Sequence, residues 1–189
     1  MTLIILLTLL GIIVVLITFG IIIYNGLISL KHNISKAWSN IDVLLKQRYD
    51  ELPKLVSVCE GYMQHEQAVL ENVTKARSMI DSAGSEKEVV NANNAITSAL
   101  RSLFAVVENY PDLKADRAFR QLQARVSQLE DQIADRRELY NESVNLFNIR
   151  IEQFPDVIIA GVMRLDEKEL WQIDPEHRED VEMQFSARA

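Results

Sequence analysis

The chain has few of the residues that build metal sites. Among 189 residues it has one cysteine, Cys59, and three histidines, His32, His65 and His177. A single cysteine excludes an intrachain disulfide. The histidines share no ligand spacing, and the six-residue separation of Cys59 from His65 does not place them on one helical face. Zinc sites need clustered ligands at short spacings, so we expect no metal site.

Glycine is also scarce, and its pattern excludes common phosphate-binding and nucleophile motifs. The six glycines do not cluster, and the sequence contains neither a glycine-rich phosphate loop nor a nucleophile elbow. An acidic zone is interpreted as a solvated helix face rather than a catalytic pair. We therefore expect no catalytic, cofactor-binding or metal-binding residues, no cofactor and no enzymatic activity. The acidic zone consists of Glu130, Asp131, Asp135, Glu138 and Glu142.

Positive charge is in deficit, and no charged side chain appears before Lys31. The 27 acidic residues outnumber the 20 Lys and Arg residues, giving a formal net charge of −7. General nucleic-acid binding depends on neutralising phosphates with Lys and Arg. Broad adhesion to anionic lipid depends on similar basic clusters. The composition therefore argues against both kinds of partner.

What the sequence does have is one long apolar run, from Thr2 to Ile23. A helix needs about 20 apolar residues to cross a hydrocarbon core about 30 Å thick. A cleaved signal peptide is the alternative, but such peptides have a basic segment before an apolar core of about 7–15 residues. Tyr24 and Asn25 follow at the expected interfacial depth. The run predicts a transmembrane anchor over residues 1–25, with residues 2–23 in contact with membrane lipid.

The residues that flank this run predict its orientation. Lys31, His32 and Lys36 lie just beyond the run, Lys46 and Arg48 come slightly later, and no Lys or Arg precedes it. The positive-inside rule then places the carboxyl-terminal part in the cytoplasm and the short amino terminus outside. We expect a single-pass protein of the cell membrane.

Apolar residues after the run recur at steps of three and four, which predicts helices. Pro53 removes a backbone donor, so we expect a kink or short break there. Gly84 is expected to end a helix in the left-handed conformation. Ser85 and Glu88 have the capping-box spacing and predict a helix that runs to about Asn109. The inward residues expected before Gly84 are Ile34, Ala37, Trp38, Ile41, Leu44, Leu45, Leu52, Leu55, Val56, Cys59, Tyr62, Met63, Leu70, Val73, Ala76 and Ile80.

A final long helix is expected over residues 113–154, between Pro111 and Pro155. Strict seven-residue spacing of apolar residues keeps one seam facing a partner, so this helix has a coiled-coil pattern. Arg136 falls on the second seam. It is interpreted as a long side chain that reaches solvent, and the alternative is a buried pair with a carboxylate of the first helix. The first seam is Phe119, Val126, Ile133, Tyr140, Phe147 and Phe154.

Residues 156–189 form a different kind of segment. Small apolar patches precede and follow Pro175, and an extended stretch is possible near Phe185. These apolar residues are too many for a disordered tail and too few for a core, so we expect them to pack on the bundle or on another chain. The patches are Val157, Ile158, Ile159, Ala160, Val162 and Met163; Leu170, Trp171 and Ile173; and Val181, Met183 and Phe185.

Many short blocks occur in a fixed order along the chain, and together they resemble the LemA family over about residues 24–160. The resemblance implies a membrane-anchored antiparallel bundle of long helices with no generally assigned activity. The chain departs from the family pattern at Glu51, at Lys54 and after Ala160. The blocks are Tyr24-Asn25-x-Leu27, Ala37-Trp38-Ser39-x-Ile41-Asp42-Val43-x-Leu45, Lys46-x-Arg48-Tyr49-Asp50-x-Leu52-Pro53-x-Leu55-Val56, Tyr62-x-x-His65-Glu66, Ala76-Arg77, Tyr110-Pro111-Asp112-Leu113-Lys114-Ala115, and the downstream residues Phe119, Leu122, Ile133, Ala134, Arg137, Tyr140-Asn141, Val144, Asn148 and Phe154-Pro155.

These observations predict an all-α fold, with one amino-terminal transmembrane helix followed by an antiparallel bundle of three to four long helices. The expected domains are the anchor at 1–25, a LemA-like bundle at 26–155 and a tail at 156–189. The expected function is a non-catalytic structural or interaction scaffold that self-associates at the membrane as a homo-oligomer. Residues 31–189 alone are expected to stay soluble and largely monomeric. The alternatives are a membrane-tethered signalling adaptor and a hydrolase whose site combines surface carboxylates with His65.

Overall fold

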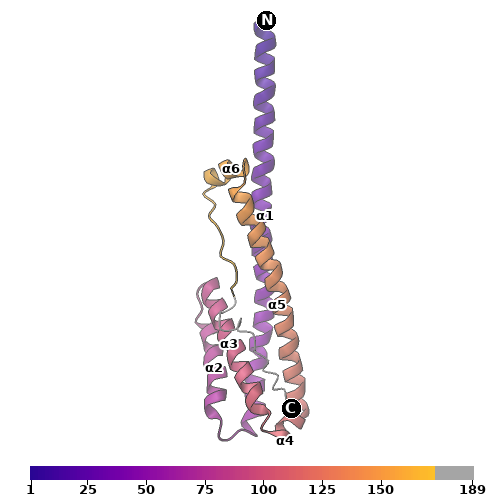
Figure 1. Cartoon of the computed structure of the whole chain (residues 1–189), viewed down its shortest axis with the longest axis vertical. Coiled ribbons are helices and arrows are strands. Elements are labelled where there is room, and N and C mark those ends of the chain that lie inside the picture. The colour runs from indigo at the N-terminus through magenta and orange to yellow at the C-terminus, as the bar shows by residue number, and fades with distance from the viewer. Residues whose placement is uncertain (173–189) are drawn as a thin grey trace, which may run out of the picture. The chain divides into compact units, whose positions relative to one another are not determined.

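Residues 1–172 are described by a computed structural model, and within them every regular element is an α-helix (Figure 1). This confirms the predicted all-α fold class with an apolar amino-terminal helix. The tail residues beyond Gln172, including Ile173, Pro175, His177 and the possible extended stretch near Phe185, lie outside the described residues. The helices are α1 (Thr2–Glu60), α2 (Gln67–Asp81), α3 (Glu86–Val107), α4 (Pro111–Ala115), α5 (Arg117–Glu152) and α6 (Asp156–Met163).

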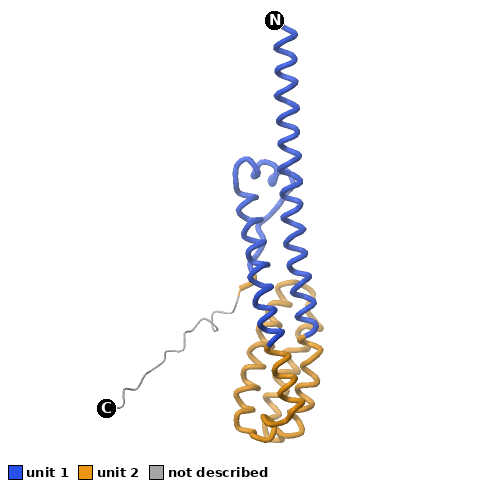
Figure 2. Tube along the Cα trace, turned by 90° about the vertical axis from the view of Figure 1, so that its right-hand side faces the viewer, with its two compact units in different colours: residues 1–47, 128–170 blue, residues 48–127, 171–189 orange. Residues whose placement is uncertain are grey.

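The described residues divide into two units, which are coloured separately in Figure 2. Unit 1 contains residues 1–47 and 128–170, so it combines the first part of α1 with the second part of α5 and with α6. Unit 2 contains residues 48–127 together with Trp171 and Gln172 of the described tail. The two longest helices each contribute to both units.

The apolar run forms the start of α1, which is 59 residues long. Within the part of the chain that the structure describes, α1 is the one helix long and apolar enough to cross a membrane. The hydroxyls of Thr8 and Thr18 donate to the carbonyls of Ile5 and Val14, each at 2.8 Å. The hydroxyl donors inside the run therefore form their hydrogen bonds within the helix, as a lipid environment requires.

We expected a kink or a short break at Pro53, and the break is wrong because the helix continues through this residue. Leu52 and Leu55 on either side of the proline are fully buried. Tertiary packing of this apolar face outweighs the loss of one backbone donor. α1 instead ends at Glu60, where the N–H groups of Tyr62 and Met63 both donate to the carbonyl of Cys59 at 2.9 Å.

In unit 1, α5 runs antiparallel to α1 (Figures 1 and 2). Trp38 of α1 meets the predicted seam residue Tyr140, with ring centroids 5.7 Å apart and an interplanar angle of 60°. Phe154 is 82 % exposed and does not continue the seam, because α5 has already ended at Glu152. The buried residues of the pair are Ile23, Leu27, Ile34, Ile41, Leu45, Leu129, Ile133, Tyr140, Val144, Phe147 and Ile151.

In unit 2, α2 and α3 form a hairpin whose inward faces bury residues at the predicted helical spacing. Phe104 and Phe119 meet edge to face, with centroids 6.4 Å apart. The seam residues Phe119 and Val126 are buried as predicted. The buried residues of the two hairpin helices are Leu70, Val73, Ala76, Ala92, Asn93, Ile96, Ala99, Leu100, Leu103 and Val107.

The turn between α2 and α3 confirms one predicted cap and corrects the other. Ser85 accepts a hydrogen bond from the Glu88 N–H at 3.3 Å, as the capping spacing predicted. The Glu88 carboxylate accepts from the N–H of Gly84 at 2.6 Å. No glycine in the described chain has a positive φ, so the left-handed cap expected at Gly84 is wrong. α2 already ends at Asp81, and the Ala83 N–H closes the turn onto the Ile80 carbonyl at 3.0 Å.

The helix expected over 113–154 is divided at Asp116. This residue adopts an extended backbone conformation between α4 and α5, with φ −61° and ψ 133°. Its carboxylate accepts a hydrogen bond from the Phe119 N–H at 2.9 Å. A side-chain acceptor here satisfies a backbone donor of the first turn, so Asp116 is a helix cap rather than an interior residue.

Candidate functional site

The buried face of α1 in unit 2 contains a cationic side chain, Arg48, which is 0 % exposed. It lies between Leu45 and Leu52 in the same apolar stripe. Burying a charge is costly unless polar partners surround it. Its burial therefore has a desolvation cost that hydrogen-bond partners must offset.

Two residues of α3 meet the Arg48 guanidinium. Nη2 donates to Oδ1 of Asn93, and Nη1 donates to Oγ1 of Thr97 at 3.3 Å. Asn93 is itself buried, whereas Thr97 is partly buried. A planar guanidinium holds two acceptors in a fixed geometry, so this cluster sets how α1 and α3 align in unit 2. Thr97 has a hydroxyl, but neither Arg48 nor Asn93 is a general base that could activate it as a nucleophile.

Sequence reasoning assigned Arg48 to the flank of the membrane run and did not place it in the core. A signal was nevertheless present, because residues 41, 45, 48, 52, 55 and 59 follow steps of four and three. The same steps pass through Asn93 between Val89 and Ile96. Polar residues at these positions indicate a buried hydrogen-bonded contact between helices.

Arg136 behaves as the preferred sequence interpretation predicted, because its side chain is exposed. The alternative of a buried carboxylate pair does not hold for this residue. Arg136 lies in unit 1 beside an open groove of about 570 Å³ between α1 and α5. The groove mixes apolar and polar side chains and contains no cysteine, serine or histidine. Its lining residues are Asn40, Val43, Leu44, Gln132, Asp135, Arg136 and Leu139.

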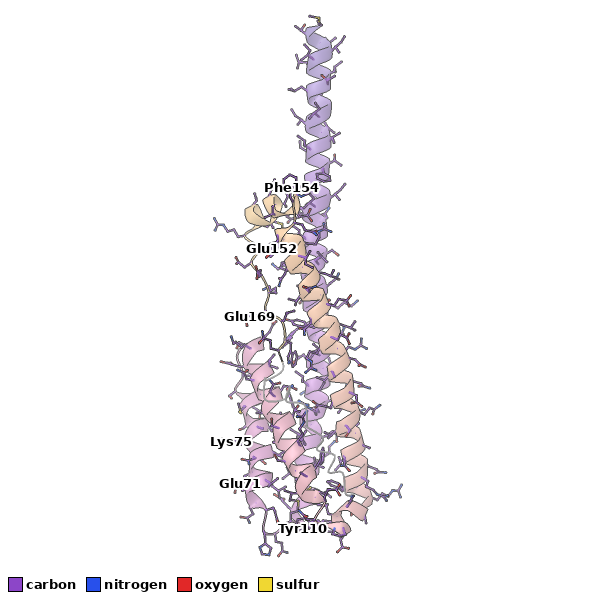
Figure 3. All side chains as sticks on the ribbon, in the orientation of Figure 1. Glu71, Lys75, Tyr110, Glu152, Phe154 and Glu169 are labelled. Carbon is purple, nitrogen blue, oxygen red and sulfur yellow. The ribbon has the colours of Figure 1, made fainter. Side chains whose placement is uncertain are left out.

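A second polar cluster lies where α1, α3 and α4 of unit 2 end. The Tyr62 hydroxyl donates to Oδ2 of Asp116 at 3.2 Å. The Phe119 N–H and the Tyr62 hydroxyl lower the pKa of Asp116, and that carboxylate in turn raises the pKa of Tyr62. A hydrogen bond to Glu66 raises the pKa of Tyr110, which is labelled in Figure 3. Both phenols therefore stay protonated donors near neutral pH.

The other residues considered for chemistry are not brought together. Cys59 is buried, and desolvation raises the pKa of its thiol to about 11, so the thiolate is suppressed. His32 and His65 are exposed, in unit 1 and unit 2 respectively. Within residues 1–172, no group of three or more His, Cys, Asp or Glu side chains has the geometry to hold a metal ion.

Comparisons with known proteins match one family. The model of the LemA family matches residues 37–185, which extends past the point after Ala160 where the resemblance was expected to weaken. Protein LemA of Metamycoplasma hominis is 29 % identical over 159 residues, covering 84 % of this chain and 73 % of that protein.

Magnetosome proteins are also similar. Magnetosome protein MamQ 1 of Paramagnetospirillum magneticum is 22 % identical over 178 residues, covering 80 % of this chain and 65 % of that protein. Magnetosome protein MamQ of Magnetospirillum gryphiswaldense is 20 % identical over 172 residues, covering 76 % and 63 % respectively. The chain thus spans less than two thirds of the length of these MamQ relatives.

Replacing Arg48 with alanine is expected to destabilise the protein strongly. The Arg48→Ala change leaves the buried Asn93 acceptor unsatisfied, which costs roughly 1–3 kcal/mol before any cavity cost is added. The matched control is Arg136→Ala, where an exposed arginine is expected to change stability by only about 0.5 kcal/mol or less. Denaturant unfolding of the full chain in detergent, followed by circular dichroism, measures both. Equal effects of the two changes would contradict a structural role for Arg48.

Asp116 is expected to make stability depend on pH at the acidic end. Its folded-state pKa is lowered, so its contribution is present above the unfolded value of about 3.9 and is lost as pH falls through the folded value. Asp116→Asn retains a capping side chain but cannot ionise, so stability should fall less steeply below pH 4 than in the wild type. Asp112→Asn, which replaces an exposed carboxylate of α4 with an amide, is the control. Thermal unfolding across a pH series measures the slopes, and identical slopes for wild type and Asp116→Asn would refute the assignment.

Proposed function

Because the chain belongs to the LemA family, we propose that it is a membrane-anchored, non-catalytic scaffold that self-associates at the membrane. The observation that carries this proposal is the continuity of α1. Residues 2–23 and the following bundle residues of unit 1 belong to one uninterrupted helix. A continuous helix is a stiff connection, whereas a Gly/Ser-rich linker behaves as a flexible coil. The arrangement suits a protein whose role is to hold surfaces at the bilayer.

The use of the polar groups supports a non-catalytic role. Arg48, Asn93 and Thr97 join helices, and Asp116 caps one. The thiol of Cys59 is buried with a raised pKa. His65, which the hydrolase alternative requires, is exposed at the α1–α2 connection. The structural contacts of Arg48, Asn93, Thr97 and Asp116 thus account for the positions of these four side chains.

Self-association is supported by partly exposed apolar side chains of α5 in unit 1, one of which, Leu139, also lines the groove beside α1. Leu139, Leu146 and Ile149 are each nearly half exposed. Leu139 and Leu146 are seven residues apart, so they lie on one side of the helix. Exposed apolar side chains that lie close together on one side of a helix commonly mark an association surface. A shared membrane adds to it, because confining the copies raises their effective concentration.

The orientation we propose is amino terminus outside and the helical bundle in the cytoplasm. Lys31 and Lys36 are exposed just beyond the apolar run and support this orientation. Arg48 is buried and does not contribute to the flanking surface charge. Lys46 is exposed and remains part of the basic flank.

A cysteine in the bundle should be protected in intact cells. In a Cys59→Ala background, Glu142→Cys should react with an impermeant maleimide only after the membrane is permeabilised. A cysteine in a short polar extension added before Thr2 is the control and should react in intact cells. Labelling of Glu142→Cys without permeabilisation would reverse the proposed orientation.

The intact chain in mild detergent should have the mass of more than one copy. Leu139→Glu combined with Leu146→Glu places charges at these exposed apolar positions of α5 and should lower the mass toward one chain. Asn145→Glu adds an exposed charge between these leucines and serves as the control. Deleting residues 156–189 tests whether the tail also contributes. Native mass spectrometry, corrected for detergent, gives the masses, and a single-chain mass for the wild type would refute self-association.

A further inference from the structure

α6 has an unusual surface for a helix in water. Its outward residues are apolar, and Val162 is 80 % exposed. Val157 and Ile158 are exposed beside it, and Phe154 just before the helix is 82 % exposed. The sole charged residue of α6, Asp156, is buried. The helix therefore turns its charge inward and its aliphatic side chains outward.

The inward side of α6 is fixed in place. The Arg150 side chain at the end of α5 donates to and forms an ion pair with the Asp156 carboxylate. Ala160, one turn later, is buried. The exposed apolar face is consequently part of a docked element with a defined direction.

The segment after α6 is also held. The Asn148 amide donates to the Lys168 carbonyl and accepts from the Lys168 N–H, both at 2.9 Å. These paired hydrogen bonds tie the chain after α6 back to α5. The start of α6 and the segment that follows it are thus both attached to α5.

α6 lies beside the end of the apolar run of α1. A Cβ built on Gly26 would lie 3.6 Å from Nη2 of Arg150, the residue that pairs with Asp156. Ile23, the last residue of the run, is buried, although the preceding residues of the run are almost all exposed. Figures 1 and 2 both show the end of α5 and α6 alongside this part of α1, and Figure 3 labels Phe154 there.

This position corresponds to the boundary of the hydrocarbon region. If residues 2–23 cross the membrane, Gly26 lies about 4.5 Å beyond the last apolar residue at about 1.5 Å per residue. Interfacial helices place their apolar faces about 5–10 Å into the boundary between headgroups and acyl chains. The exposed side chains of α6 are therefore within reach of that layer.

We propose that Phe154 and α6 form a second membrane contact, with Val157, Ile158 and Val162 inserted into the bilayer interface beside the anchor. The contact adds a second point of attachment to that of α1, and two points restrict how unit 1 tilts and rotates on the membrane. It rests on the proposed membrane insertion of residues 2–23 but is independent of self-association.

Apolar insertion, rather than attraction to anionic headgroups, drives this contact. The outward face of α6 carries no basic side chain. Arg150 is paired with Asp156, and the next basic residue, Arg164, follows the helix rather than lying on its outward face. The contact is therefore expected in neutral phosphatidylcholine membranes and at high salt, since screening weakens only the electrostatic part of binding.

The experiment uses the full chain in phosphatidylcholine vesicles, with Cys59 replaced by alanine and a single cysteine labelled with an environment-sensitive fluorophore. Val162→Cys probes α6. Val43→Cys is the matched control, because this exposed valine of unit 1 lies 20 residues beyond Ile23 on α1. Phe19→Cys is the positive control inside the apolar run.

Nitroxide-labelled lipid should quench the probe at 162 and at 19 but leave the probe at 43 bright. The emission at 162 should also shift to the blue relative to that at 43. A probe at 162 that behaves like the one at 43 would overturn the proposal. A blue-shifted probe at 162 that lipid nitroxide does not quench, and that reddens when the protein is diluted in lipid, would also overturn it by assigning a second copy as the occupant. Loss of quenching at 19 would instead overturn membrane insertion of the run itself, which separates failure of the anchor from failure of the α6 contact.

Discussion

The backbone hydrogen bonding of α1 is the constraint on which the rest of unit 1 depends. A segment in hydrocarbon must satisfy every N–H and C=O internally, and a helix does so without help from neighbours. The hydroxyls of Thr8 and Thr18 follow the same rule by bonding to carbonyls of the preceding turn. Because the helix continues past the apolar run without a break, the direction of the anchor also sets the direction of the first bundle helix in unit 1. α5 then packs antiparallel to it through Tyr140 and Trp38.

Periodicity predicted the features that depend on burial over long segments. The heptad positions from Phe119 to Phe147 are buried because a seven-residue spacing keeps them on one side of α5. Local signals were less reliable. Pro53 lies inside a helix because the apolar residues around it are buried, and Gly84 is not left-handed because α2 ends three residues earlier. A short-range rule fails when packing or an earlier cap determines the backbone.

The two arginines Arg48 and Arg136 show why the polar cluster was harder to predict than the core. Both fall near apolar seams, and the sequence singled out Arg136. An arginine at a seam position can either extend its guanidinium into solvent or bury it against hydrogen-bond acceptors. Arg48 finds acceptors because Asn93 and Thr97 of α3 lie opposite it. Predicting this contact requires knowing how α1 and α3 align. Arg136 borders an open groove in unit 1, where its side chain remains in solvent. Whether each arginine is buried or exposed depends on tertiary contacts, so the neighbouring residues in the sequence do not determine it.

The outward face of α6 follows from the same balance between apolar burial and available partners. Burying a valine or isoleucine side chain is worth roughly 1.5–3 kcal/mol relative to leaving it exposed. In α6, Val157, Ile158 and Val162 are exposed and lack this stabilisation. Asp156 instead occupies a buried position that an apolar residue would ordinarily fill. The ion pair with Arg150 compensates the buried carboxylate and fixes the helix with its aliphatic side outward. If residues 2–23 cross the membrane as proposed, the hydrocarbon around this run lies next to α6, which is held beside Ile23. In the proposed arrangement, one bilayer supplies the apolar environment of both the run of α1 and the outward face of α6.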